Sequence, residues 1–110
     1  MRLSDDAQAI ISKSCDKEKL IAVMKAVEEK MDAAQITPTE LQWTVLINHL
    51  NEMVERAERG EKMSGVDPEL FSEVSPEALG IAREVVNEIG NLTEDESYVL
   101  SVHFETAKMN

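Results

Sequence analysis

The sequence has little cysteine and no long apolar run, and each scarcity excludes a class of protein. With one cysteine, Cys15, no intrachain disulfide can form, as is usual in a reducing cytosol. No run of about 18 apolar residues is present, so no membrane-spanning helix is expected. The N-terminus carries Asp5 and Asp6 where a signal peptide needs apolar residues. We therefore expect a cytoplasmic protein.

Positive charge is also scarce. The 11 Lys and Arg residues are outnumbered by 22 Asp and Glu residues, which gives a formal net charge of −11. Proteins bind nucleic acids and anionic membrane surfaces through clustered Lys and Arg side chains, and the sequence shows no such cluster. We expect no direct contact with nucleic acid or with a membrane.

The common catalytic and metal-binding motifs are missing. The chain has no Gly-x-Ser-x-Gly turn, no glycine-rich phosphate loop, no His-Glu-x-x-His motif and no cluster of Cys and His residues. Di-iron sites in helical bundles use Glu-x-x-His, but Leu46 and Leu100 stand three residues before the two histidines. We expect neither an enzyme nor a bound metal or other cofactor.

Helical periodicity, by contrast, extends over most of the chain. Apolar residues recur every three to four positions, and no strand-like alternation is present. Principal helices are predicted near residues 17–34, 38–59, 76–89 and 94–107, with a short helix at 4–13 and a helical turn at 68–73. A chain of 110 residues is one domain by length. The predicted fold class is all-α: a compact bundle of four to five helices over 17–110, preceded by an N-terminal extension at 1–16.

Several residues are predicted to start or stop these helices. Residues 37–40 (TPTE) and 93–96 (TEDE) have the form of capping boxes, the first with proline at the first helical position. Gly60 and Gly90 are expected to end the helices before them. Trp43, early in the second long helix, is expected to anchor either the core or an interface between two copies.

Two histidines lie on or beside the apolar stripes of predicted helices. His49 follows Leu46 by three residues and precedes Met53 by four, and His103 is flanked in a similar way. Histidine titrates near neutral pH, and its ring nitrogens can carry a proton, a metal or a phosphoryl group. By position alone, a histidine beside an apolar stripe is more often a hydrogen-bonded core residue than a reactive one.

Two segments built around these histidines resemble a known family. Residues 46–60 read LINHLNEMVERAERG, and residues 94–104 read EDESYVLSVHF. In this order they are similar to the first and second histidine segments of PTS regulation domains. Those domains are helical modules of bacterial antiterminators and transcription activators governed by the sugar phosphotransferase system. Residues 75–84 occupy the family's linking region, and the resemblance covers about residues 17–110.

The resemblance implies a bundle of about five helices, often dimeric, and a site for phosphorylation. In the family, histidines accept phosphoryl groups from HPr or from enzyme II components, and the added charge shifts dimer packing. His49 and His103 would be the acceptors. Arg56, two turns after His49, would be a nearby cation for the phosphate, and Arg59 and Arg83 are further candidates.

The predicted function is therefore a stand-alone PTS regulation domain, a homodimer that acts as a regulatory phospho-acceptor. Its expected partners are HPr, enzyme II components or an operon-encoded regulator. His49 and His103 should approach each other in a shared groove open to solvent, with Arg56 close by. One position departs from the family, since Asn48 stands where an aspartate commonly precedes the first histidine.

Two other functions remain open. The chain could be a degenerate scaffold or dimerisation module with structural histidines, or a binder of sugar phosphates that uses the same arginines. The environment of the imidazoles discriminates between the scaffold and the phospho-acceptor. Buried ring nitrogens with backbone partners favour the scaffold, and exposed nitrogens beside an arginine favour the phospho-acceptor.

Overall fold

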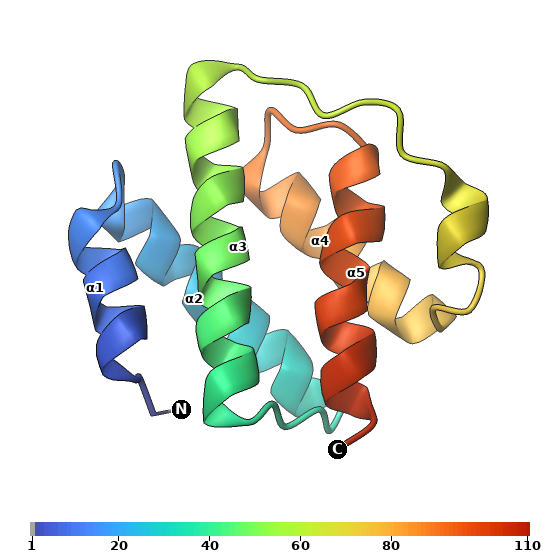
Figure 1. Ribbon diagram of the computed structural model, residues 1–110, viewed down its shortest axis with the longest axis horizontal. Helices are drawn as coiled ribbons and strands as arrows, with labels where there is room; N and C mark the ends of the chain where they lie inside the picture. The colour runs from blue at the N-terminus through green and yellow to red at the C-terminus, as the bar shows by residue number, and fades with distance from the viewer. Residues whose placement is uncertain (1) are drawn as a thin grey trace.

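The structure, a computed structural model, describes residues 2–110 as five α-helices and one 3-10 helix (Figure 1). In chain order these are α1 (Asp5–Lys13), α2 (Lys17–Ala33), α3 (Glu40–Arg59), the 3-10 helix η1 (Pro68–Phe71), α4 (Pro76–Ile89) and α5 (Asp95–Lys108). Residues 2–110 contain no strand. The predicted all-α fold class is confirmed, and the predicted helix bounds lie within two residues of those observed.

α3 is the central helix of the bundle. It contacts each of the other four α-helices, and α5 contacts both α3 and α4. In Figure 1, α1 lies on one side of α3 and α5 on the other, while α2 and α4 cross behind them. α3 and α5 run in opposite directions in that view, so they form an antiparallel pair. Residues early in α5 therefore lie near residues late in α3.

The start of α3 differs from the predicted capping box at 37–40. The N-cap is Thr39, whose Oγ1 accepts a hydrogen bond from the Gln42 backbone N–H, while Gln42 Oε1 accepts one from the Thr39 backbone N–H. A capping box is present, but two residues later than predicted, and it satisfies N–H groups that a helix start leaves unpaired. α3 ends as predicted at Gly60, which has a left-handed φ of 70°.

The second predicted capping box, at 93–96, is wrong. Thr93 Oγ1 donates to the Met63 carbonyl at 2.7 Å, and α5 begins at Asp95 without a side-chain cap. The Glu96 side chain, expected to close the box, instead bonds Arg56 of α3. Partners brought in by the tertiary fold have displaced the local capping bonds.

The core lies between α3 and the helices packed around it. Trp43 is 1% exposed, so its role as a core anchor is confirmed, and the interface alternative is not supported. α1 covers α3 through the buried Ala7 and a 2.7 Å hydrogen bond between the Ser4 and Thr44 hydroxyls. The division of the chain at residue 16 stays a prediction. Among residues 2–110, no helix has the length and apolar character needed to cross a membrane.

Candidate functional site

The two histidines meet where α3 and α5 pack together. His49 lies in the middle of α3 and His103 in the second half of α5, and their ring centroids are 4.9 Å apart with a 58° tilt between the planes. The expected approach of the two rings is confirmed. We call this pair, together with Arg56 of α3 and Glu96 of α5, the α3/α5 seam.

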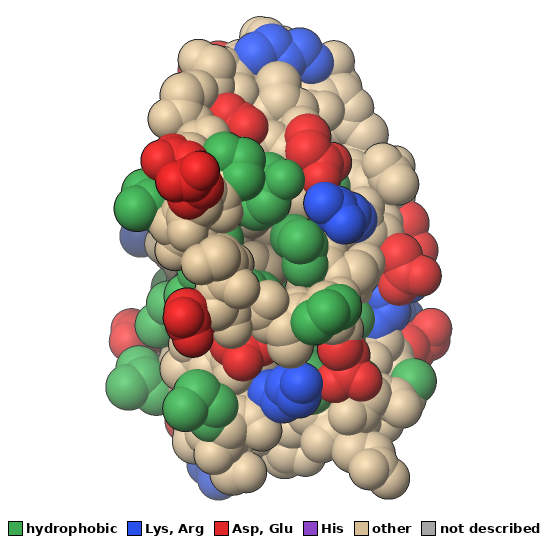
Figure 2. Space-filling view, turned by 90° about the vertical axis from the view of Figure 1, so that its right-hand side faces the viewer, with side chains coloured by type: hydrophobic (Ala, Val, Ile, Leu, Met, Phe, Trp, Pro, Cys, Tyr) green, Lys and Arg blue, Asp and Glu red, His purple; other side chains and the backbone are tan. Residues whose placement is uncertain are grey.

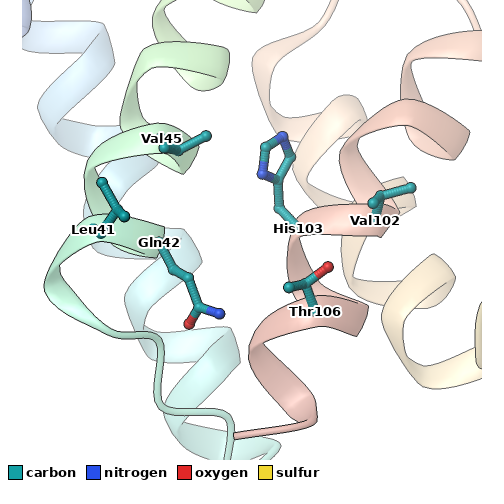
Figure 3. Close-up of a pocket in the computed structure, with 6 residues that line it drawn as sticks. All are labelled: Leu41, Gln42, Val45, Val102, His103 and Thr106. Carbon is teal, nitrogen blue, oxygen red and sulfur yellow. The ribbon is translucent and has the colours of Figure 1, made fainter.

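The two rings differ in exposure. His49 is buried, with 8% of its surface exposed, whereas His103 is half-buried. His103 lines a groove of about 340 Å³, which it shares with Leu41, Gln42, Val45, Val102 and Thr106. In Figure 3 its ring projects from α5 into the space that faces α3. The expected groove open to both rings is therefore wrong in part, because His49 does not line it.

Burial sets the protonation of both rings. It lowers the pKa of His49 to about 4, with smaller contributions in the same direction from His103 and from the positive charge of Arg56. Burial also lowers the pKa of His103. Removing an imidazolium from water is costly, so the neutral ring is favoured. Both rings are accordingly neutral at pH 7, and each keeps one nitrogen with a free lone pair.

Neither imidazole has a hydrogen-bond partner within the described part of the chain, and no nitrogen of either ring is among the fully buried atoms that lack one. The pair thus matches neither expected pattern: His49 is buried but lacks the backbone partner of a structural histidine, and His103 is accessible but has no free arginine beside it. Within the α3/α5 seam, the two neutral imidazoles contact each other and neither accepts or donates a hydrogen bond to a described residue.

Arg56 is near the histidines but its guanidinium is already occupied. Its Nε donates to Glu96 Oε2 at 2.8 Å, and its Nη2 donates to Glu96 Oε1 at 2.7 Å. Glu96 is fully buried, and the Arg56 side chain is 19% exposed. These hydrogen bonds raise the pKa of Arg56. A bidentate pair of this kind is both strong and geometrically specific, so Arg56 serves Glu96 in this state.

Arg59 and Arg83 lie away from the histidine pair. Arg59 is ten residues after His49, about 15 Å along α3, and bonds Glu61 at 2.8 Å. Arg83 is on α4 and bonds Glu94 at 2.8 Å. The structure therefore brings together His49, His103 and Arg56, and leaves the other two candidate cations in exposed ion pairs elsewhere.

Glu96 is the seam residue that sequence reasoning missed. It was interpreted as part of a capping box, yet a signal was available in the spacing. Arg56 follows His49 by seven residues, and His103 follows Glu96 by seven. Seven residues are about two helical turns. On two neighbouring antiparallel helices, these equal spacings place Arg56 opposite Glu96 when His49 lies opposite His103.

Two smaller hollows lie outside the seam, one beside Trp43 and one beside Lys19. The described residues include no group of three or more His, Cys, Asp or Glu side chains that could hold a metal ion. Figure 2 shows the face to the right of the view in Figure 1, where hydrophobic side chains are interspersed with acidic and basic ones. His103 is reached through the groove that it lines between α3 and α5.

Comparisons with known proteins identify the family and support the fold. The PRD domain family matches residues 22–107. A crystal structure of a PRD-containing transcription regulator from Lactobacillus casei superposes with a TM-score of 0.93 at 42% sequence identity, covering 99% of this chain and 97% of that one. The comparison with curated proteins gave no match. With most of its length matched by the family and its helices superposing on those of a member, the chain belongs to the PRD domain family.

Proposed function

We propose that this PRD domain is a regulatory module whose His103 accepts a phosphoryl group from a component of the sugar phosphotransferase system, HPr or an enzyme II protein. The observation that carries the proposal is the combination of access and protonation at His103. Its ring is half-buried at the wall of an open groove, and burial lowers its pKa, so a neutral, nucleophilic imidazole lies where a donor can approach. His49, the other candidate acceptor, is shielded from such an approach.

The transfer itself needs little from this chain. The lone pair of a His103 ring nitrogen attacks phosphorus, a nitrogen–phosphorus bond forms, and the bond from phosphorus to the donor's leaving atom breaks. The second ring nitrogen of His103 then gives up its proton, and the donor's leaving atom takes up a proton. The catalytic groups would belong to the donor, so the chain acts as a substrate and regulator and not as an enzyme.

The regulatory output would be a change in association. Leu41 and Val45 of α3 and Val102 of α5 are exposed apolar side chains that line the groove beside His103. Burying such a surface in a homodimer is favourable, and a phosphate of about −2 charge within it is not, unless a cation is supplied. We propose that the unmodified chain forms a cytoplasmic homodimer through this face. Phosphorylation would weaken this dimer or change how its two subunits pack.

One observation favours the second candidate function, an unphosphorylated scaffold. Arg56 and Glu96 already link α3 and α5, and His49 is buried between the same two helices. In a scaffold these contacts would serve stability alone. The sugar-phosphate binder has less support, because the candidate arginines are paired and the groove residues include no charged side chain.

The experiment is incubation with phosphoenolpyruvate, enzyme I and HPr, followed by intact mass spectrometry under alkaline conditions. We expect one acid-labile phosphoryl group on the wild-type chain. His103→Gln should abolish it, and peptide mapping of the wild-type chain should place the phosphoryl group on His103 and not on His49. Light scattering before and after transfer reports the mass of the assembly. Absence of phosphate with HPr and with purified enzyme II domains would leave the scaffold as the function.

A further inference from the structure

A phosphate on His103 would enter a groove without a free cation. The side chains that share this groove with His103 are apolar or neutral: Leu41, Gln42, Val45, Val102 and Thr106. Arg56, the nearest arginine, has both of its short hydrogen bonds committed to the fully buried Glu96. Taking Arg56 away would leave the Glu96 carboxylate buried without a partner, which is costly. A positive charge from the protein that balances the phosphate would therefore come from another group.

His49 is the group in contact with His103 that can supply this charge. The rings are 4.9 Å apart, and the His49 nitrogens have no hydrogen-bond partner in the described part of the chain. His49 is 8% exposed, so most of the residue lies away from water. A neutral imidazole that gains one proton becomes a cation with two N–H donors.

We infer that His49 takes up a proton from solvent when His103 is phosphorylated, and that the resulting imidazolium holds the phosphate against the α3/α5 seam. This inference rests on the proposed function. It makes His49 a positioning residue and a charge-compensating partner instead of a second acceptor. The phosphate would then be stabilised inside the fold by a group that is neutral in the unmodified chain.

The charges around His49 are compatible with such a change. Those that act on the ring come from His103 on α5 and from Arg56 on α3, and both disfavour its protonation, as burial does. Arg56 is in turn balanced by Glu96, with Glu52 also in range of its charge. α1, α2 and α4 also contact α3 but add no charge that acts on the ring. A dianion on His103 would reverse the sign of the largest charge contribution. An opposite charge within about 4–6 Å favours the charged form by about 1–3 pH units, which would raise the pKa of His49 from about 4 to about 5–7.

A substitution tests this response without any phosphoryl transfer. His103→Glu places a carboxylate beside His49, and His103→Gln is the neutral control of the same size. The remaining histidine, His49, is titrated by NMR through its ring proton and nitrogen shifts. We expect its midpoint in His103→Glu to lie about 1–3 pH units above that in His103→Gln. Equal midpoints in the two folded variants would overturn the inference. If His103→Glu does not fold, the shorter His103→Asp is compared with His103→Asn.

The phosphorylated protein provides the second measurement. The wild-type chain, labelled with ¹⁵N, is phosphorylated with the HPr system or with phosphoramidate, and the ring nitrogens of His49 are titrated beside those of the unmodified chain. Phosphate on His103 with a His49 midpoint about 1–3 pH units above that of the unmodified chain supports the inference. Phosphate on His103 with an unchanged His49 midpoint, or phosphate on His49 itself, overturns it while phosphorylation stands. If no phosphate appears, the proposed function fails, and the His103→Glu comparison decides separately whether His49 responds to a neighbouring anion.

Discussion

Arg56–Glu96 and His49–His103 are contacts between the same two helices, two turns apart, and they differ in charge and in hydrogen bonding. The arginine and glutamate are charged, bidentate and fully paired, with donor–acceptor distances of 2.7 and 2.8 Å. The histidines are neutral and touch without a hydrogen bond to any described residue. The first contact joins the helices in one geometry, because a buried carboxylate tolerates no loss of its partner. The second can still gain a proton or a phosphoryl group.

In a helical bundle, a polar contact whose hydrogen bonds are not all made is a position where a switch can be placed. A buried polar group with all its hydrogen bonds made resists change, since any alternative state leaves it unpaired. A buried group with unused hydrogen-bonding capacity is the one that a new charge can recruit. In this seam the ion pair supplies rigidity and the imidazole pair supplies capacity for change.

The largest effect is expected from breaking the ion pair. Glu96→Ala removes the carboxylate and leaves the half-buried Arg56 guanidinium unpaired, so the free energy of unfolding should fall by about 3–5 kcal/mol. Urea denaturation measures it. The control is Glu94→Ala, which removes an exposed carboxylate from Arg83 nearby and should leave the urea midpoint within error. Similar losses in both variants would contradict the distinction between buried and exposed pairs.

The next effect is pH dependence from the histidine pair. The pKa of His49 is lowered to about 4 in the folded chain, while the unfolded chain has the ordinary value near 6.5. Between these values the unfolded state binds a proton that the folded state does not, so stability falls as the pH drops from about 6.5 to 4. Linkage gives a loss of up to about 3 kcal/mol across that window. His49→Leu should flatten this part of the urea-midpoint profile; an unchanged slope would show that other groups cause it.

A smaller effect is expected when the buried imidazole is replaced by an apolar group. Because His49 makes no hydrogen bond to a described residue, His49→Leu loses none and replaces a buried polar ring with an apolar side chain. At pH 7.5 we expect a change in the free energy of unfolding within about 1 kcal/mol. His49→Ala, which leaves a cavity, is the comparison and should cost about 2–3 kcal/mol. A loss in His49→Leu as large as in His49→Ala would indicate a hydrogen-bonded structural histidine.

The helices themselves could be predicted because their signals are local. Apolar residues at three- to four-residue spacing, and glycine after the last turn, act within a single helix, and the helix bounds followed within two residues. The N-cap assignments were less secure. Thr39 caps α3 in place of Thr37, and Thr93 donates to the distant Met63 carbonyl, since a side chain with a tertiary partner need not cap its own helix.

The site was predicted in part for the same reason. His49, His103 and Arg56 could be named from their helix faces and from the family resemblance, and the structure brings them together. The partner of Glu96 cannot be read from local spacing, because it lies 40 residues away and the sequence around Glu96 also fits a capping box. The different exposure of the two histidines was also not visible in the sequence, where both occupy similar positions beside an apolar stripe.

The sequence by itself determined the all-α class, the approximate helix bounds, the acidic charge and the two histidine segments that identify the family. Each of these depends on residue type or on spacing within about two helical turns. Only the tertiary structure decided that Arg56 is occupied by Glu96, that His49 is buried and that His103 faces the groove. Those facts follow from how α3 and α5 pack against each other, and packing between distant segments sets burial, pairing and pKa together.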